Sequence, residues 1–297
     1  MSLFRSVLVG GAASAAAVLA LLPSSGSADT VRTAPPVAAA PVAEQAAPAN
    51  DPRLNATLFM QVSEEMQRLS RQSFALAALR LPAALDEPGS AALEQADGGA
   101  GKPPAVIFDV DETVLDNSPA QARAILAGER AFNLDSWDKW VGERAAKAMP
   151  GAVDFVAELR RRKVRVVFIT NRECRPRAAQ PGEACPQQAD TLANLRSAGL
   201  GPVDPADLML KGQKKDWPSE KASRRETVAS THRIVMSVGD QFSDFMPVTR
   251  SQGPEERQRL AAAHEDLWRT RWIVIPNPSY GAWLDALPEP ATRALRP

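Results

Sequence analysis

The sequence predicts an α/β fold, a doubly wound parallel sheet with helices on both of its faces. The prediction rests on short apolar runs that recur along the chain, and on amphipathic segments with helical spacing that separate them. A polar residue follows three of the runs. Asp109 follows residues 105–108, Thr170 follows residues 166–169, and Asp240 follows residues 234–238 after Gly239. Ligands of open α/β sheets bind beyond the carboxyl ends of the strands, so these polar residues mark the expected site.

The composition is that of an ordinary globular protein and argues against several classes of function. The 297 residues are 24% charged and 44% hydrophobic, and Lys+Arg equals Asp+Glu at 35 each, so no basic field favours a nucleic-acid polymer. Two histidines are too few for a zinc hydrolase built on several His ligands, and neither lies in the R-H-G context of a histidine phosphatase. The sequence lacks the G-x-x-x-x-G-K-[ST] string of P-loop NTPases.

The first 50 residues predict export. Arg5 precedes an apolar stretch over residues 7–22, and small residues follow up to position 28, as in a secretory signal peptide over residues 1–28. The stretch is short for a membrane span, although an uncleaved anchor is the alternative. Residues 29–50 are rich in Ala and Pro and are expected to form a flexible linker. We expect one domain over residues 51–288 and a C-terminal tail over 289–297.

Helical spacing predicts the remaining framework. Residues 54–85 repeat apolar side chains every three or four positions, which predicts N-terminal helices interrupted at Pro82. The other expected helices are 118–128, 151–162, 187–198, a helix that begins at Pro218 and includes Lys221, and a charged amphipathic helix over 255–268. Further strands are expected over residues 207–211 and 271–275.

Two carboxylates one residue apart, Asp109 and Asp111, follow the first expected strand. Residues i and i+2 of an extended chain point to the same side, so both can face one crevice. Close carboxylates repel each other and need a shared proton or a cation, and a hard divalent cation such as Mg²⁺ suits their oxygen atoms. One carboxylate can then act as a nucleophile and the other as a general acid and base. A solvated Asp pair in a loop is the alternative.

The string D-V-D-E-T-V-L-D-N over residues 109–117 resembles motif I of the haloacid dehalogenase superfamily, and more closely that of the class C acid phosphatases of bacterial surfaces. The other motifs of that family match Thr170 after a strand, Lys221 in a K-x-x-R-R string, and Asp240 and Asp244 in G-D-x-x-x-D. Lys214 and Lys215 are alternatives to Lys221, and Gln241 stands where the family usually has Asn. The resemblance implies a Rossmann-like core with a small α-helical cap.

The resemblance also implies an activity, that of an Mg²⁺-dependent acid phosphatase. Its substrates would be phosphomonoesters such as nucleoside 5′-monophosphates, hydrolysed through an aspartyl-phosphate. The implied catalytic residues are Asp109 as nucleophile, Asp111 as acid and base, and Thr170 and Lys221 as ligands of the phosphoryl group. The implied metal ligands are Asp109, Asp240 and the backbone carbonyl of Asp111, supported by Asp244 and Asn171. Because Asp111 must begin protonated, an acidic optimum is expected. Phosphotransfer to an alcohol, or a non-catalytic surface binding protein that retains the fold, are the alternatives.

Aromatic residues complete the expected site. A W-x-x-W string places Trp137 and Trp140 on one helical face, and Tyr280 lies in a P-N-x-x-Y-G-x-W string. In the resembling family, residues that match Trp137 and Tyr280 stack on the base of a nucleotide, which any base permits. Trp140 is expected to pack in the core.

Cys174 and Cys185 are the only cysteines of the chain. An even number of cysteines in an exported protein predicts a disulfide, with free or metal-binding thiols as the alternative. The resembling family is often lipid-anchored through a cysteine at the end of the signal, and this chain has no cysteine before Cys174. We therefore expect a periplasmic or secreted protein without a membrane anchor, and the family suggests a homodimer.

Overall fold

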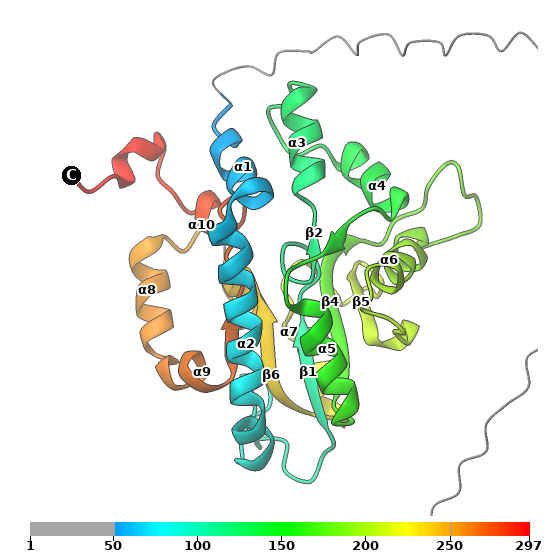
Figure 1. Ribbon diagram of the computed structural model, residues 1–297, viewed down its shortest axis with the longest axis vertical. Helices are drawn as coiled ribbons and strands as arrows, with labels where there is room; N and C mark the ends of the chain where they lie inside the picture. Colours follow the sequence, from blue (N-terminus) through cyan, green and yellow to red (C-terminus); the bar gives the residue numbers. More distant parts are fainter. Residues whose placement is uncertain (1–50, 250) are drawn as a thin grey trace, which may run out of the picture. The chain divides into compact units, whose positions relative to one another are not determined.

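A five-stranded parallel sheet forms the core of the computed structural model, which describes residues 51–249 and 251–297 (Figure 1). The strand order is β5-β4-β1-β6-β7, and all four neighbouring pairs are parallel. The strands are β1 (Pro104–Phe108), β4 (Arg165–Glu173), β5 (Leu208–Lys211), β6 (Arg233–Gly239) and β7 (Trp272–Val274). The apolar runs therefore form strands as predicted, and β1 lies at the centre with Asp109 at its carboxyl end. The expected signal peptide and linker lie outside the described residues.

Helices cover both faces of this sheet, which confirms the doubly wound arrangement. The α-helices are α1 (Leu54–Val62), α2 (Glu64–Asp86), α3 (Ser118–Leu126), α4 (Leu134–Glu143), α5 (Ala152–Arg161), α6 (Pro186–Ser197), α7 (Ala222–Thr231), α8 (Pro254–Ala262), α9 (Glu265–Thr270) and α10 (Ala282–Asp285). Short 3₁₀ turns are η1 (Pro205–Asp207), η2 (Phe242–Asp244) and η3 (Ala291–Ala294). Side chains alternate along β1: Val106 and Phe108 pack with α2, α5 and α6, whereas Ala105 and Ile107 pack with α7 and α9.

An insertion between β1 and α5 forms the small helical cap. It contains α3 and α4 and a two-stranded antiparallel sheet of β2 (Leu115–Asp116) and β3 (Lys147–Ala148). Figure 1 shows α3 and α4 beyond the carboxyl ends of the central strands. The cap therefore lies over the end of the sheet at which the motif residues gather.

The N-terminal helices are interrupted at Ser63, not at Pro82 as predicted. Ser63 has extended backbone angles (φ −80°, ψ 131°), and its hydroxyl accepts a hydrogen bond from the Met66 amide at 3.0 Å, which caps α2. Pro82 lies inside α2, whose buried face continues through Phe74, Ala77, Leu81 and Ala84. Packing of this face against the sheet outweighs the hydrogen bond that the proline removes.

Two further helix boundaries differ from prediction. The segment expected as one helix over 255–268 is split into α8 and α9 at His264, which leaves helical geometry (φ −125°, ψ 29°). The change of direction lets Trp268 pack on Phe245 and Trp272, with ring centroids 5.0 and 4.7 Å away. The helix expected from Pro218 begins instead at Ala222, so that Lys221 lies just before its first turn.

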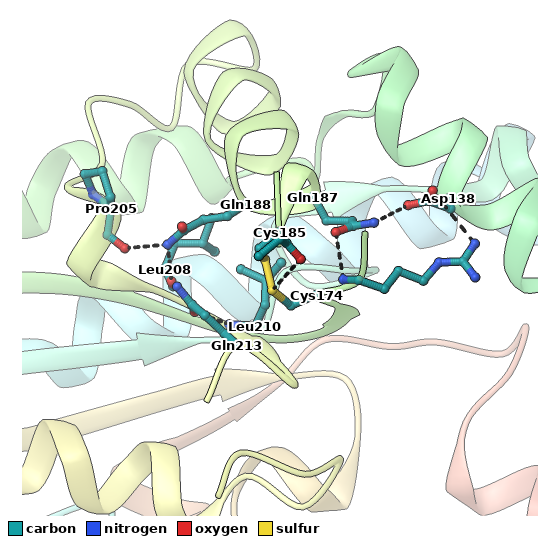
Figure 2. Close-up of a disulfide and its surroundings, with 11 residues drawn as sticks. Asp138, Cys174, Cys185, Gln187, Gln188, Pro205, Leu208, Leu210 and Gln213 are labelled. Atoms are coloured by element: carbon teal, nitrogen blue, oxygen red, sulfur yellow. Dashed lines mark hydrogen bonds and ion pairs between the residues drawn. A yellow bond between two sulfur atoms is a disulfide. The ribbon is translucent and has the colours of Figure 1, made fainter. Parts of the chain in front are cut away.

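Cys174 and Cys185 form the predicted disulfide (Figure 2). The bridge closes a loop between β4 and α6, and polar contacts join this region to the cap. Gln187 accepts a hydrogen bond from the Arg175 amide at 3.0 Å and donates one to Asp138 of α4 at 2.9 Å. Arg177 pairs with the same Asp138 at 2.7 Å, so the loop is fastened to α4.

None of the helices in the described part of the chain is long and apolar enough to span a lipid bilayer.

Candidate active site

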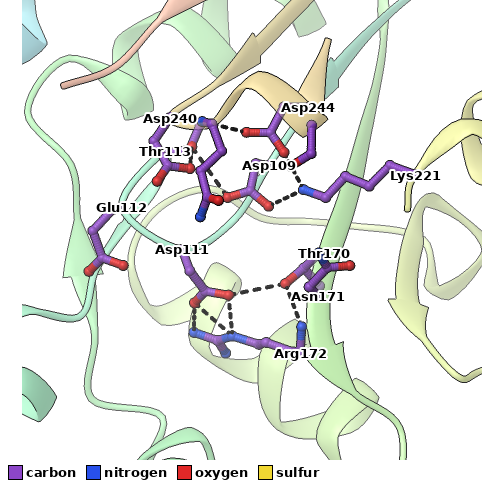
Figure 3. Close-up of polar contacts among 12 residues, drawn as sticks. Asp109, Asp111, Glu112, Thr113, Thr170, Asn171, Arg172, Lys221, Asp240 and Asp244 are labelled. Carbon is purple, nitrogen blue, oxygen red and sulfur yellow. Dashed lines mark hydrogen bonds and ion pairs between the residues drawn. The ribbon is translucent and has the colours of Figure 1, made fainter. Parts of the chain in front are cut away.

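A buried lysine joins two carboxylates at the carboxyl end of the sheet (Figure 3). The Lys221 ammonium group lies 2.5 Å from Asp109 Oδ1 and 2.6 Å from Asp244 Oδ1, and its side chain is 5% exposed. Asp109 follows β1, and Asp244 ends η2, which is separated from β6 by Asp240 and Gln241. A Cβ atom at Gly239 would clash with the Asp244 side chain, so glycine is required where the chain leaves β6. The predicted Asp109, Lys221 and Asp244 thus meet at one point.

Asp240 completes a cluster of three acidic residues. One carboxylate oxygen each from Asp109, Asp240 and Asp244 lie within 4.8 Å of one another. Asp240 accepts a hydrogen bond from Asn277 at 2.7 Å. The Thr113 hydroxyl lies 3.4 Å from Asp109 and 3.3 Å from Asp240, and its single proton can serve one of them at a time.

Burial shapes the electrostatics of this cluster. Burial raises the pKa of Asp109 to about 6, although Lys221 lowers it, and burial with the neighbouring Asp109 holds the pKa of Asp240 well above its usual range. Burial lowers the pKa of Lys221, but the Asp109 and Asp244 carboxylates outweigh it and the net shift is upward. One ammonium group thus contacts two of the three clustered acidic groups, and a bound cation would relieve the remaining repulsion.

Asp111 belongs to a second group, which Figure 3 shows beside the first. Its carboxylate pairs with the buried Arg172 at 2.9 Å and accepts hydrogen bonds from Asn117 at 2.9 Å and Thr170 at 3.1 Å. Arg172 is held in turn by Thr191 at 3.1 Å. Thr170 is fully buried, and its single proton is directed at Asp111 in this arrangement. The side chain of Asp111 is therefore fixed by three neighbours.

Tyr280 reaches the site through Glu112, which lies next to Asp111 in the chain. The Tyr280 hydroxyl donates a hydrogen bond to the Glu112 carboxylate, which also accepts one from the Asn117 amide at 2.8 Å. Glu112 is 1% exposed and has a left-handed backbone (φ 57°), which turns the chain after the motif strand. Burial and the nearby Asp111 raise the pKa of Glu112 to about 8.

The two tryptophans of α4 have different surroundings. Trp140 is buried, and its indole N–H donates to Asn117 at 2.8 Å, which agrees with its expected place in the core. Trp137 is half-buried, and the Arg172 guanidinium lies 5.8 Å from the centre of its ring. Its other ring neighbour is Phe132, at 6.3 Å. Trp137 therefore keeps an accessible ring close to the group around Asp111.

Several residues of the site were not assigned a role from the sequence: Thr113, Glu112, Asn117, Arg172, Arg224 and Asn277. Most of them follow a motif carboxylate or hydroxyl within a few positions, so proximity in the chain is the signal that could have found them. Asn171, expected as a support, accepts a hydrogen bond from Arg224 at 2.8 Å. Arg224 itself was visible only as part of the K-x-x-R-R string.

Comparison with known proteins identifies the family. The model of the HAD superfamily, subfamily IIIB (acid phosphatase), matches residues 56–283. The chain belongs to this acid phosphatase family. Its match includes all the motif residues from Asp109 to Tyr280, so the family resemblance predicted from the sequence is confirmed.

Individual relatives agree with this assignment. The class C acid phosphatase of Bacillus anthracis is 32% identical, with a TM-score of 0.66 over 80% of this chain and 88% of that chain. A second structure of that enzyme, with tungstate bound, is 31% identical with the same TM-score and coverage. Acid phosphatase 1 of Solanum lycopersicum is 32% identical over 178 residues, which are 59% of this chain. The match spans 57% of the tomato protein's length.

Proposed function

We propose that the protein is an Mg²⁺-dependent acid phosphatase that hydrolyses nucleoside 5′-monophosphates through an aspartyl-phosphate. The observation that carries the proposal is the buried Asp109 carboxylate, held by Lys221 at 2.5 Å and facing Asp240 and Asp244. A carboxylate at the end of the central strand, with a fixed cation beside it, suits nucleophilic attack on phosphorus. Membership of the acid phosphatase family supports the same reaction.

The acidic cluster fits a hard divalent cation. The donor atoms are carboxylate oxygens, which Mg²⁺ prefers, and three close carboxylates with one ammonium group leave an excess of negative charge. Both oxygens of Asp244 are engaged, one by Lys221 and the other by the Gln241 amide at 2.9 Å. We therefore assign Asp109 and Asp240 as the side chains that hold the ion, with Asp244 in a supporting position. When bound, the ion would neutralise charge between the nucleophile and the phosphate.

The reaction divides between the two groups of residues. Asp109 forms a bond to phosphorus while the bond from phosphorus to the alcohol oxygen breaks, and Asp111 delivers a proton to that oxygen. Asp111 then takes a proton from the water that cleaves the aspartyl-phosphate. Lys221 stabilises the negative charge throughout, and Thr170 can bind a phosphoryl oxygen once its hydroxyl turns from Asp111. The first step requires Asp111, which pairs with Arg172, to hold a proton, so activity is expected to fall as the pH rises.

Aromatic residues support a nucleotide as the substrate. Trp137 presents a half-buried ring next to Arg172, which pairs with Asp111, and Tyr280 is fixed through Glu112 on the neighbouring part of the motif loop. An aromatic ring near the leaving group favours a substrate with a planar base. The Bacillus anthracis relative was solved with tungstate, a tetrahedral oxyanion like phosphate, which supports phosphate recognition in the shared fold.

Phosphate release tests the proposal. The parent protein and Asp109→Asn are compared with a nucleoside monophosphate at mildly acidic pH, with Mg²⁺ and after chelation. Asp207→Asn serves as the control, since Asp207 pairs with Arg165 away from the cluster. We expect release by the parent and the control with Mg²⁺ present, and none by Asp109→Asn. Equal release by Asp109→Asn would show that another group attacks phosphorus, and no release by the parent would favour a binding protein. Transfer to an added alcohol would indicate a phosphotransferase.

We also propose that the protein is exported and, as the family resemblance suggests, forms a homodimer. The disulfide supports an oxidising compartment such as the periplasm, because such bonds are rare in the reducing cytosol. Cell fractionation tests the compartment, and sedimentation of the purified protein tests the dimer. Recovery in the cytosol, or a monomer at all concentrations, would contradict the respective proposal.

A further inference from the structure

Two consecutive arginines on the first turn of α7, Arg224 and Arg225, are fully buried beside the active site. Neighbouring residues of an α-helix point about 100° apart, because 3.6 residues complete a turn. The two side chains therefore leave the helix in different directions. Each reaches a different loop of the site, although the residues are adjacent in the chain.

Arg224 fastens the end of β4. Its guanidinium donates to the Thr170 carbonyl at 2.7 Å and to the Asn171 side chain at 2.8 Å. The same group donates to the Pro218 carbonyl at 2.8 Å, in the turn that leads into Lys221. The Thr170 backbone and the segment before Lys221 are thus held by one planar group.

Arg225 fastens the loop that follows β6. It donates to the carbonyl groups of Ser243 at 3.0 Å and Asp244 at 3.3 Å. Its opposite edge binds both oxygens of Glu94 at 3.0 Å, in the segment before β1. The position of the Asp244 backbone is therefore set from α7, and Glu94 sets the position of the guanidinium.

Lys221 lies between these two attachments. Its carbonyl accepts a hydrogen bond from the Arg225 amide at 3.0 Å, so its backbone belongs to the same helix start. Its ammonium group bridges Asp109 and Asp244, as described above. The lysine can span both carboxylates only if the start of α7 stays in place relative to Asp109 after β1 and to Asp244 after β6. Arg225 attaches α7 to the loop after β6, and Arg224 attaches the segment before Lys221 to β4, which pairs with β1.

We propose that Arg224 and Arg225 are positioning residues of the phosphatase reaction, which hold the start of α7, and with it Lys221, against the end of β4 and the loop after β6. The proposal rests on the proposed role of Lys221 in that reaction. Neither arginine touches the reacting atoms in this assignment. Arg224 acts through the backbone of Thr170 and of the segment before Lys221, and Arg225 acts through the backbone of Asp244, which binds Lys221.

The chemistry of the contacts explains why both residues are arginines. A guanidinium group offers five N–H donors in a fixed plane, whereas a lysine offers three donors around one point. Arg225 uses its plane to bind Glu94 on one side and two carbonyl groups on the other. Burial lowers the pKa of Arg224 to about 10, and its Nε atom is buried without a partner. If these residues served packing alone, apolar side chains of similar volume would suffice, because replacing a buried charged group by such side chains often leaves a protein at least as stable.

Substitution by lysine, which keeps the charge and removes the planar contacts, tests the proposal. The variants are Arg224→Lys and Arg225→Lys. Arg271→Lys is the matched control, since Arg271 is also buried and donates to carbonyl groups of Ala84 and Val235, away from the acidic cluster. Both kcat and KM are measured for phosphate release, together with the free energy of unfolding. We expect kcat to fall about 10- to 100-fold with KM within about threefold for the two test variants, as for other supporting residues. The control is expected to lose stability but to keep kcat within about twofold.

A double-mutant comparison separates positioning from general destabilisation. If Arg225 acts through Asp244, then Arg225→Lys should cost less than about twofold in kcat when Asp244→Asn is already present. An unchanged kcat in Arg225→Lys, an equal loss in Arg271→Lys, or full additivity with Asp244→Asn would overturn the proposal. If Arg225→Lys does not fold, Glu94→Gln takes its place, and a kcat equal to that of the parent would then refute it. A parent protein without phosphate release would instead refute the proposed function.

Discussion

Replacement of Lys221 by methionine removes one positive charge from the centre of the site and keeps most of the side-chain stem. The change leaves Asp109 and Asp244 buried without the ammonium group that lies 2.5 and 2.6 Å from them. Removing one partner of a buried ion pair costs about 3 to 5 kcal/mol, because the remaining charge keeps its desolvation penalty. We expect a loss of stability in this range for the metal-free protein, and a smaller loss with Mg²⁺, which supplies another positive charge.

The same substitution should reduce catalysis. Removal of a single oxyanion-hole hydrogen-bond donor costs about 2.7 to 4 kcal/mol, or about 10²- to 10³-fold in kcat, and we expect the loss of the Lys221 ammonium group to cost about as much. Chemical denaturation measures the first effect, and phosphate release at saturating substrate measures the second. Lys211→Met is the control, because Lys211 forms a half-exposed pair with Glu173 at 3.1 Å and such pairs contribute about 1 kcal/mol or less. If Lys221→Met kept kcat within about threefold of the parent, Lys221 would have no electrostatic role in the reaction.

Three other substitutions test separate features. Burial and Asp111 raise the pKa of Glu112 from its ordinary 4.5 to about 8. Between these two pH values the folded state keeps a proton on Glu112 that the unfolded chain releases. The contribution of this proton to the free energy of unfolding is therefore complete below pH 4.5 and is lost as the pH rises toward 8. Glu112→Gln should therefore flatten the fall of Tm between these limits in metal-free protein, and an unchanged slope would contradict the shift. Trp137→Ala should raise KM for a nucleoside monophosphate about tenfold, since base stacking contributes about 1 to 3 kcal/mol. The same substitution should leave KM for glycerol phosphate unchanged, because this substrate has no base. Equal effects on both substrates would argue against stacking. Replacing Cys174 and Cys185 with serine should lower the free energy of unfolding by about 3 kcal/mol in the chain-entropy model and should preserve kcat. If the denaturation curves of the variant and the parent coincide, the disulfide adds no stability.

The sheet could be predicted from the sequence because its central strands are apolar on both faces. Val106 and Phe108 face one layer of helices and Ala105 and Ile107 the other, so the run has no polar interruption until Asp109. The motif carboxylates could be placed at one edge for the same reason, since parallel strands end together. Both features depend on residues that are close together in the chain, so they can be predicted from the sequence.

Contacts between distant segments could not be predicted in the same way. Arg172 pairs with Asp111, which lies 61 positions earlier in the chain, and Tyr280 binds Glu112, which lies 168 positions earlier. No periodicity in the chain signals which arginine or tyrosine will lie against which carboxylate. The predictions of two helix boundaries were wrong for a related reason. The buried face of α2 continues through Pro82, and the aromatic packing of Trp268 divides α8 from α9. Tertiary packing determined both boundaries.

The position of β1 in the strand order has a consequence for how relatives of this protein can diversify. β1 is flanked by β4 and β6, and these three strands deliver Asp109, Thr170 and Asp240 to one edge. Trp137 and Tyr280, the residues proposed to contact the base, come from the cap and from the segment after the outermost strand β7. If the proposed roles hold, insertions and substitutions in the cap or at that sheet margin can alter which alcohol is accepted without shifting the strands that carry Asp109, Thr170 and Asp240. The fold thus places the proposed reaction centre on the ends of the central strands and the proposed recognition surface on separate segments.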